Sequence, residues 1–110
     1  EAGEGPSPMQ ALLISAAACA AMDVIAIMEK KRQKVDSYRV EISGERPPRG
    51  EFPRPFTSIH MRHIVCGQDI DPAALQRAVE LSEEKYCSVL ATLKVSPQLT
   101  SECVVEQPVG

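Results

Sequence analysis

The chain is poor in aromatic side chains. Among its 110 residues there is no Trp, and Phe and Tyr together make up only 4%. Hydrophobic residues nevertheless make up 44% of the chain, so a core can form, but it must consist of Ala, Leu, Ile, Val and Met. This length fits a single domain, and we expect residues 1–110 to fold as one unit.

The chain also lacks an excess of positive charge, since its formal net charge is −3. Proteins that bind nucleic acid carry a basic surface, so no nucleic-acid partner is expected. The one basic cluster, Lys30–Lys34, is typical of a helix C-terminus, where cations are favoured. We find no Gly-rich phosphate loop and no Ser/His/Asp arrangement, and therefore expect neither nucleotide chemistry nor hydrolysis.

Paired cysteine motifs are missing as well. The four cysteines form no CxxC pair and do not have the loop-rich spacing of a secreted disulfide scaffold, which favours a reducing, cytoplasmic setting. Cys66 lies near His60 and His63, but these two histidines fall on opposite faces of a strand. We therefore expect no metal site there, and no cofactor.

The stretch from Pro8 to Met28 is almost wholly apolar and long enough to suggest a membrane span. Gln10, Ser15 and Asp23 interrupt it, and much of the remainder is Ala. The chain opens with acidic rather than basic residues, unlike a signal peptide. We therefore predict a buried helix and no membrane partner. Because one 110-residue subunit can hardly cover such a helix, we predict a homodimer.

Turn signals and periodicity divide the chain into six elements. Ser7-Pro8 and Asp71-Pro72 are typical helix starts, with a capping side chain before a proline. A proline-rich loop over 44–55 separates two strand patterns. The predicted order is helix, strand, strand, helix, short helix, strand, over residues 8–34, 35–43, 56–66, 72–86, 88–94 and 99–106. This order indicates an α+β fold with a small antiparallel sheet packed against two helices.

Two cysteines stand out by their settings. Cys19 lies inside the long apolar helix, and Cys87 follows Tyr86 at the start of the short helix, 68 residues further on. If the fold brings them together they form a dithiol; otherwise they are two small core residues. A helix N-terminus near Cys87 would stabilise its thiolate, whereas an ionised Asp23, one turn after Cys19, would oppose a thiolate there.

Two segments resemble the OsmC/Ohr family of osmotically induced and organic-hydroperoxide-resistance proteins. The first is Gly5-Pro-Ser-Pro8 followed by the apolar helix that carries Cys19. The second is Leu81-Ser-Glu-Glu-Lys-Tyr-Cys87-Ser-Val, preceded by Asp71-Pro72. The resemblance covers nearly the whole chain in order and spacing, and it is greatest to the OsmC-like branch.

The resemblance implies an intertwined homodimer with the long helices at its centre. It also implies a thiol peroxidase in which Cys19 attacks an organic hydroperoxide, Cys87 resolves the product as a disulfide, and an external dithiol restores the enzyme. Family members usually begin with strands that carry an assisting Arg, and this region is missing here, either because the chain is truncated or because those strands are absent. They also have a Glu where this chain has Met9. These departures keep a second possibility open, a non-catalytic protein that binds a small apolar ligand at the dimer interface against Met9, Leu12 and Leu13.

Overall fold

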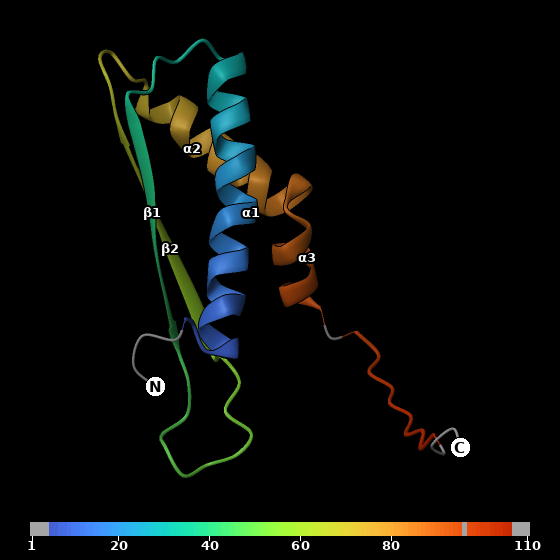
Figure 1. The fold of residues 1–110 in the computed structure, drawn as a ribbon. Coiled ribbons are helices and arrows are strands. Elements are labelled where there is room, and N and C mark those ends of the chain that lie inside the picture. The colour runs from blue at the N-terminus through green and yellow to red at the C-terminus, as the bar shows by residue number, and fades with distance from the viewer. Residues whose placement is uncertain (1–4, 96, 107–110) are drawn as a thin grey trace.

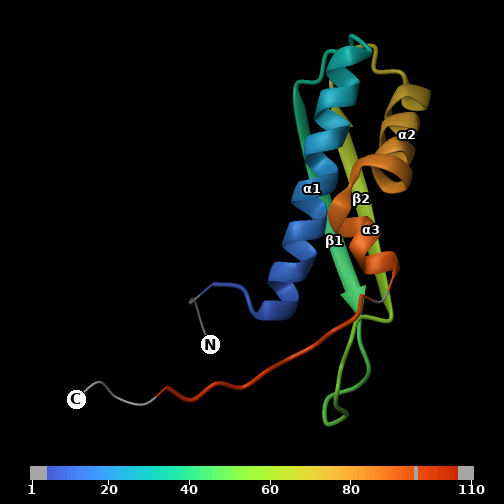
Figure 2. The same ribbon diagram turned by 90° about the vertical axis from the view of Figure 1, so that its right-hand side faces the viewer.

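The computed structural model describes residues 5–95 and 97–106. Three helices lie on one face of a two-stranded hairpin, with α1 running along the hairpin and α2 and α3 beside α1 (Figures 1 and 2). The elements in chain order are α1 (Pro8–Lys30), β1 (Ser37–Glu45), β2 (Ser58–Cys66), α2 (Pro72–Leu81), the π-helical turn η1 (Ser82–Tyr86) and α3 (Ser88–Lys94). The predicted α+β class is confirmed.

Local signals define both ends of α1. At its start the Ser7 hydroxyl accepts the Gln10 backbone N–H at 3.2 Å, and the Gln10 side chain accepts the Ser7 N–H at 2.8 Å. This is a capping box. At its end Arg32 adopts a left-handed backbone with φ of 60°, and the Gln33 N–H bonds back to the Met28 carbonyl at 3.0 Å. This Schellman-type ending stops the helix at Lys30 rather than at the predicted Lys34.

The hairpin follows the alternation seen in the sequence. β1 and β2 are antiparallel, with Ser37 opposite Cys66 and Glu45 opposite Ser58. The outer face is polar, and on it Glu41 pairs with Arg39 at 3.5 Å and with Arg62 at 3.2 Å. The inner residues are partly buried toward the helices, and they are Tyr38, Val40, Ile42, Ile59, Met61, His63 and Val65.

The predicted third strand at 99–106 is wrong. The described part of this segment contains no strand, and it extends away from the helices and the hairpin (Figures 1 and 2). Leu99, Val104 and Val105 are 73–87% exposed. Leu99, Cys103 and Val105 would share one face of a strand, but a strand also needs a neighbouring edge for its hydrogen bonds, and sequence pattern alone does not supply one.

One face of α1 forms the centre of the core. Ala16, Ala20, Val24 and Met28 recur every fourth residue and are at most 1% exposed, and Ala74 and Ala78 of α2 pack in the same core. The opposite face is uncovered: Ile14, Met22 and Ile25 are 45–73% exposed. By length and composition α1 would also suffice to cross a membrane.

The second predicted helix does not continue unbroken to Tyr86. It begins as expected, with the Asp71 carboxylate accepting the Ala73 N–H at 3.0 Å. After Leu81 the chain widens into η1, where the Cys87 N–H donates to the Ser82 carbonyl at 2.8 Å, five residues back. Such π-turns are rare and occur often at functional sites. Here the turn leaves Cys87 in an extended conformation as the N-cap of α3.

The packing of α1 predicts a position-dependent cost for a larger side chain. Ala20 is fully buried whereas Ala11 of the same helix is exposed, so Ala20→Leu should lower the free energy of unfolding by about 1–3 kcal/mol through overpacking. Ala11→Leu is the matched control and should change it by less than about 0.5 kcal/mol. Urea unfolding followed by circular dichroism measures both. Equal effects of the two substitutions would contradict the helix orientation described above.

Candidate dithiol site

The fold brings Cys19 and Cys87 together. The Cys19 and Cys87 sulfurs and a carboxylate oxygen of Asp23 all lie within 4.8 Å of one another. Cys19 and Asp23 are one turn apart on the same face of α1, and Cys87 arrives from the junction of η1 and α3. Of the two possibilities left open by the sequence, proximity of the two cysteines is the one observed, and both are free thiols.

Cys87 is buried at the start of α3. Its side chain is 2% exposed, and its sulfur accepts the Leu90 N–H at 3.5 Å. The pKa of the Cys87 thiol is raised, first by burial and then by hydrogen bonding with the Cys19 sulfur, while the Leu90 and Val89 N–H groups act in the opposite direction. The sequence correctly predicts the helix N-terminus, but its stabilising effect on the thiolate is outweighed by desolvation. Cys19 is the more accessible of the two.

Asp23 is held by Ser82. The Ser82 hydroxyl donates to Asp23 Oδ2 at 2.9 Å, and Ser82 is only 1% exposed. Within the described ranges no salt bridge involves Asp23. The sequence did not connect Ser82 with Asp23, because the two residues are 59 positions apart. The serine inside the Leu81–Cys87 motif was the available signal.

Three arginines that could stabilise a thiolate are instead paired with glutamates. Arg39 and Arg62 pair with Glu41 on the outer face of the hairpin, and Arg77 pairs with Glu80 at 3.6 Å on α2. A hollow of about 440 Å³ does lie next to Asp23. Ala26, Ile27, Leu81 and Tyr86 line it together with Lys30 and Lys31. It gives the Asp23 side of the site an approach from the surface.

The two histidines and the remaining two cysteines do not form a cluster. His60 and Cys66 lie on the outer face of β2 and His63 on the inner face, so the expectation that the two histidines do not converge is confirmed. Cys103 is exposed in the C-terminal segment. His63 stacks on Tyr38, whose hydroxyl lies 2.7 Å from His63 Nδ1.

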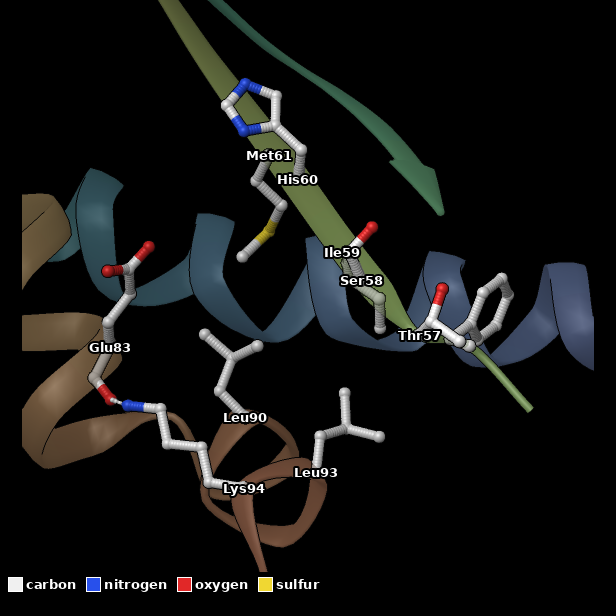
Figure 3. Close-up of a pocket in the computed structure, with 10 residues that line it drawn as sticks. Thr57, Ser58, Ile59, His60, Met61, Glu83, Leu90, Leu93 and Lys94 are labelled. Carbon is white, nitrogen blue, oxygen red and sulfur yellow. Dashed lines mark hydrogen bonds between the residues drawn. The ribbon is translucent and has the colours of Figure 1, made fainter. Parts of the chain in front are cut away.

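A second hollow, of about 510 Å³, lies between β2 and α3. Met61 of β2 and Leu90 and Leu93 of α3 point toward one another across it, and the Lys94 ammonium donates to the Glu83 carbonyl at 2.8 Å at one side (Figure 3). The residues that line it do not include Met9, Leu12 or Leu13, the predicted ligand contacts. Its lining also excludes both cysteines of the pair.

These features agree with a single family. A sequence profile described as OsmC-like protein matches residues 1–102. The chain belongs to the OsmC-like family. Among its relatives, protein YhfA of Escherichia coli strain K12 is 45% identical over 97 residues, which cover 88% of this chain and 71% of YhfA. The YhfA sequence from Shigella flexneri matches equally well.

Solved structures support the OsmC-like fold. A hypothetical protein from Aquifex aeolicus VF5 is 40% identical with a TM-score of 0.77, the match covering 84% of this chain and 68% of that one. An OsmC-like hydroperoxide resistance protein from Jannaschia sp. CCS1 has a TM-score of 0.73 at 17% identity, covering 98% and 73% of the two chains. At that identity the second likeness concerns the fold alone. The resemblance noted in the sequence is confirmed.

The lowered pKa of His63 predicts that the stability of this OsmC-like chain depends on pH. Burial lowers the pKa of His63 from 6.5, against a weaker opposing effect of Glu83, and among the described residues its buried Nε2 has no hydrogen-bond partner. The unfolded chain then binds a proton as the pH falls below about 6.5, before the folded chain does, so the free energy of unfolding decreases with falling pH.

His63→Gln should flatten this decrease between about pH 7 and 5.5. His60→Gln, on the outer face of the same strand, is the control and should retain the wild-type profile. Urea midpoints measured across this range test both variants. An unchanged slope in His63→Gln would assign the pH dependence to other groups.

Proposed function

We propose that this OsmC-like protein is a thiol-dependent organic hydroperoxide reductase that uses Cys19 and Cys87. The observation that carries the proposal is the approach of the two sulfurs to within 4.8 Å, from residues far apart in sequence. Membership in the OsmC-like family supports the same chemistry, through the resemblance to organic-hydroperoxide-resistance proteins noted in the sequence. Four free thiols suit a reducing, cytoplasmic setting, which is part of the proposal.

The different exposure of the two cysteines supports the roles proposed for them. Cys19 is the accessible one, so its thiolate attacks the peroxide oxygen, the O–O bond breaks, and the leaving alkoxide takes a proton to become an alcohol. Cys19 is then a sulfenic acid. Cys87 stays a buried thiol with a raised pKa until its sulfur attacks the Cys19 sulfur, which forms the disulfide and releases water. An external dithiol restores both thiols by exchange.

Asp23 lies where the resolving step needs a proton acceptor. Because Cys87 is protonated in its buried position, its attack on the sulfenic acid must release a proton. The Asp23 carboxylate is within 4.8 Å of the Cys87 sulfur, and Ser82 holds one of its oxygens at 2.9 Å. A positioned carboxylate at this distance can receive the proton after a small closure, or through one water molecule.

A second candidate function is the binding of a small apolar ligand without catalysis. The hollow between β2 and α3 favours it, because Ile59, Met61, Leu90 and Leu93 give that hollow apolar walls. The free-thiol count before and after one equivalent of cumene hydroperoxide separates the two functions. Consumption of two thiols supports the reductase, whereas an unchanged count leaves only the binding protein.

We also propose that two copies associate through the uncovered face of α1. Ile14, Met22 and Ile25 lie at 45–73% exposure along one side of this helix, and a shallow apolar surface continues from them to Val40 and Ile42 of β1. A second copy laid along this face would remove that surface from water. This arrangement accounts for the apolar length of α1 without a membrane.

The reductase proposal predicts unequal effects of the two cysteines. In a Cys66→Ser/Cys103→Ser background, which should keep full activity, Cys19→Ser should abolish hydroperoxide consumption. Cys87→Ser should consume about one equivalent and stop, because the sulfenic acid is not resolved. Peroxide assays with mass spectrometry of the cysteine peptides test this. If Cys66 or Cys103 is oxidised in the unsubstituted chain while Cys19 is unmodified, Cys19 is not the cysteine that attacks the peroxide.

The dimer proposal predicts that a charge on the exposed face of α1 separates the subunits. Met22→Glu should convert a dimer into a folded monomer, because association would bury the new carboxylate without a partner. Leu99→Glu is the matched control, an exposed position in the C-terminal segment, and should leave the dimer intact. Sedimentation velocity at micromolar concentration measures both. A monomeric unsubstituted chain would refute the proposal.

A further inference from the structure

We propose that, in the reduced state, Cys19, Asp23 and Cys87 bind a divalent metal ion of the zinc class. The three donor atoms lie within 4.8 Å of one another, two of them on α1 and the third at the start of α3. The proposal rests on this geometry and not on hydroperoxide turnover. It concerns the same side chains as the reductase site, but in a different chemical state.

The spacing of the donors is close to what zinc requires. Bonds of about 2.3 Å to sulfur and about 2.1 Å to oxygen in a tetrahedron place the sulfurs about 3.8 Å apart and each sulfur about 3.6 Å from the oxygen. The three donors here all lie within 4.8 Å of one another. A closure of about 1 Å, within the reach of side-chain torsions, completes the half-formed site.

The supporting contacts hold two of the donors in place. Ser82 donates to Asp23 Oδ2 and so orients the carboxylate. The Leu90 N–H holds the Cys87 sulfur at 3.5 Å. Hydrogen bonds of this kind orient metal ligands and raise metal affinity. The third donor, Cys19, is fixed relative to Asp23 by the single helical turn that separates them.

Charge also favours a cation at this point. When the ion binds, both thiols release their protons to solvent, so two thiolates and a carboxylate meet at one place. No salt bridge offsets Asp23 in the described part of the chain; Lys30 and Lys31 lie beyond it, along the neighbouring hollow. A divalent ion neutralises most of this charge. Three protein ligands leave the fourth zinc position open to water.

The donor set selects the ion. Thiolates suit zinc and exclude magnesium or calcium, which prefer oxygen ligands only. Formation of the Cys19–Cys87 disulfide removes two of the three donors, so metal and hydroperoxide compete for the same thiols. A bound ion therefore protects the pair from oxidation.

Cobalt(II) titration of the reduced Cys66→Ser/Cys103→Ser chain tests the site, because Co²⁺ replaces Zn²⁺ and is coloured. We expect one Co²⁺ per chain, with a thiolate-to-cobalt charge-transfer band and the intense visible bands of tetrahedral cobalt, displaced by Zn²⁺. Cys19→Ser, Cys87→Ser and Asp23→Asn should each weaken binding at least about 10-fold. Disulfide-oxidised protein should not bind. Circular dichroism confirms that each variant is folded.

Ser82→Ala tests whether the orientation of Asp23 contributes to metal affinity, which the three ligand substitutions do not test. It keeps all three donors but removes the orienting hydroxyl, so Zn²⁺ affinity should fall roughly 10–100-fold. Ser88→Ala, at an exposed serine on the first turn of α3, is the control and should bind as the parent does.

Pale octahedral cobalt spectra, or binding that survives in both Cys19→Ser and Cys87→Ser, would overturn the metal site. Hydroperoxide consumption without metal binding would overturn the metal site alone and leave the reductase proposal standing. Metal binding in a chain that does not consume hydroperoxide would support the metal site and refute the reductase.

Discussion

The close packing of one α1 face against the α2–η1–α3 segment is the constraint on which the site depends. Ala16 and Ala20 are fully buried, and Val24 and Met28 continue the same stripe. Small side chains let the two backbones approach closely, and that approach carries Cys19 and Asp23 to within reach of Cys87. A large residue in place of Ala16 or Ala20 would hold the segments apart, and the cysteines would then be two unrelated thiols.

The π-turn η1 determines how Cys87 enters this contact. An uninterrupted α-helix from Pro72 would carry Cys87 onward in helical register, whereas the wide turn stops the helix and frees Cys87 to cap α3. The same turn buries Ser82 against Asp23. Three polar groups are thereby arranged in an otherwise apolar interior, at the cost of a less favourable helical geometry. Cysteine, carboxylate and hydroxyl are positioned together, so the proposed redox chemistry and the proposed metal site share the same side chains.

The assignment of the fold and the proposal of an activity rest on different observations in this protein. Membership in the OsmC-like family follows from the profile match and from relatives at 40–45% identity. The likeness to a hydroperoxide resistance protein at 17% identity adds the architecture only. The proposed chemistry therefore rests on the exposure, burial and hydrogen bonds of Cys19, Cys87 and Asp23. Their surroundings lack a salt-bridged arginine in the described part of the chain, so Ser82 and the helix N-terminus are the observed polar supports.

Local sequence determined most of the secondary structure, because its signals act over a few residues. Ser7-Pro8 and Asp71-Pro72 start helices through caps that any chain with these residues can form. The alternation in residues 37–45 and 58–66 determines which hairpin face is apolar. The strand predicted at Leu99–Glu106 did not form, because a strand also requires a neighbouring strand that no local pattern provides.

Only the tertiary structure decided which residues form the site. Cys19 and Cys87 are 68 residues apart, and their approach depends on how α1 packs against η1 and α3. The family resemblance pointed to this pair, whereas periodicity and spacing left it open. The Ser82–Asp23 bond, the buried state of Cys87 and the π-turn were not predicted. Each of them arises from desolvation and packing between distant segments, which the order of residues along one segment does not encode.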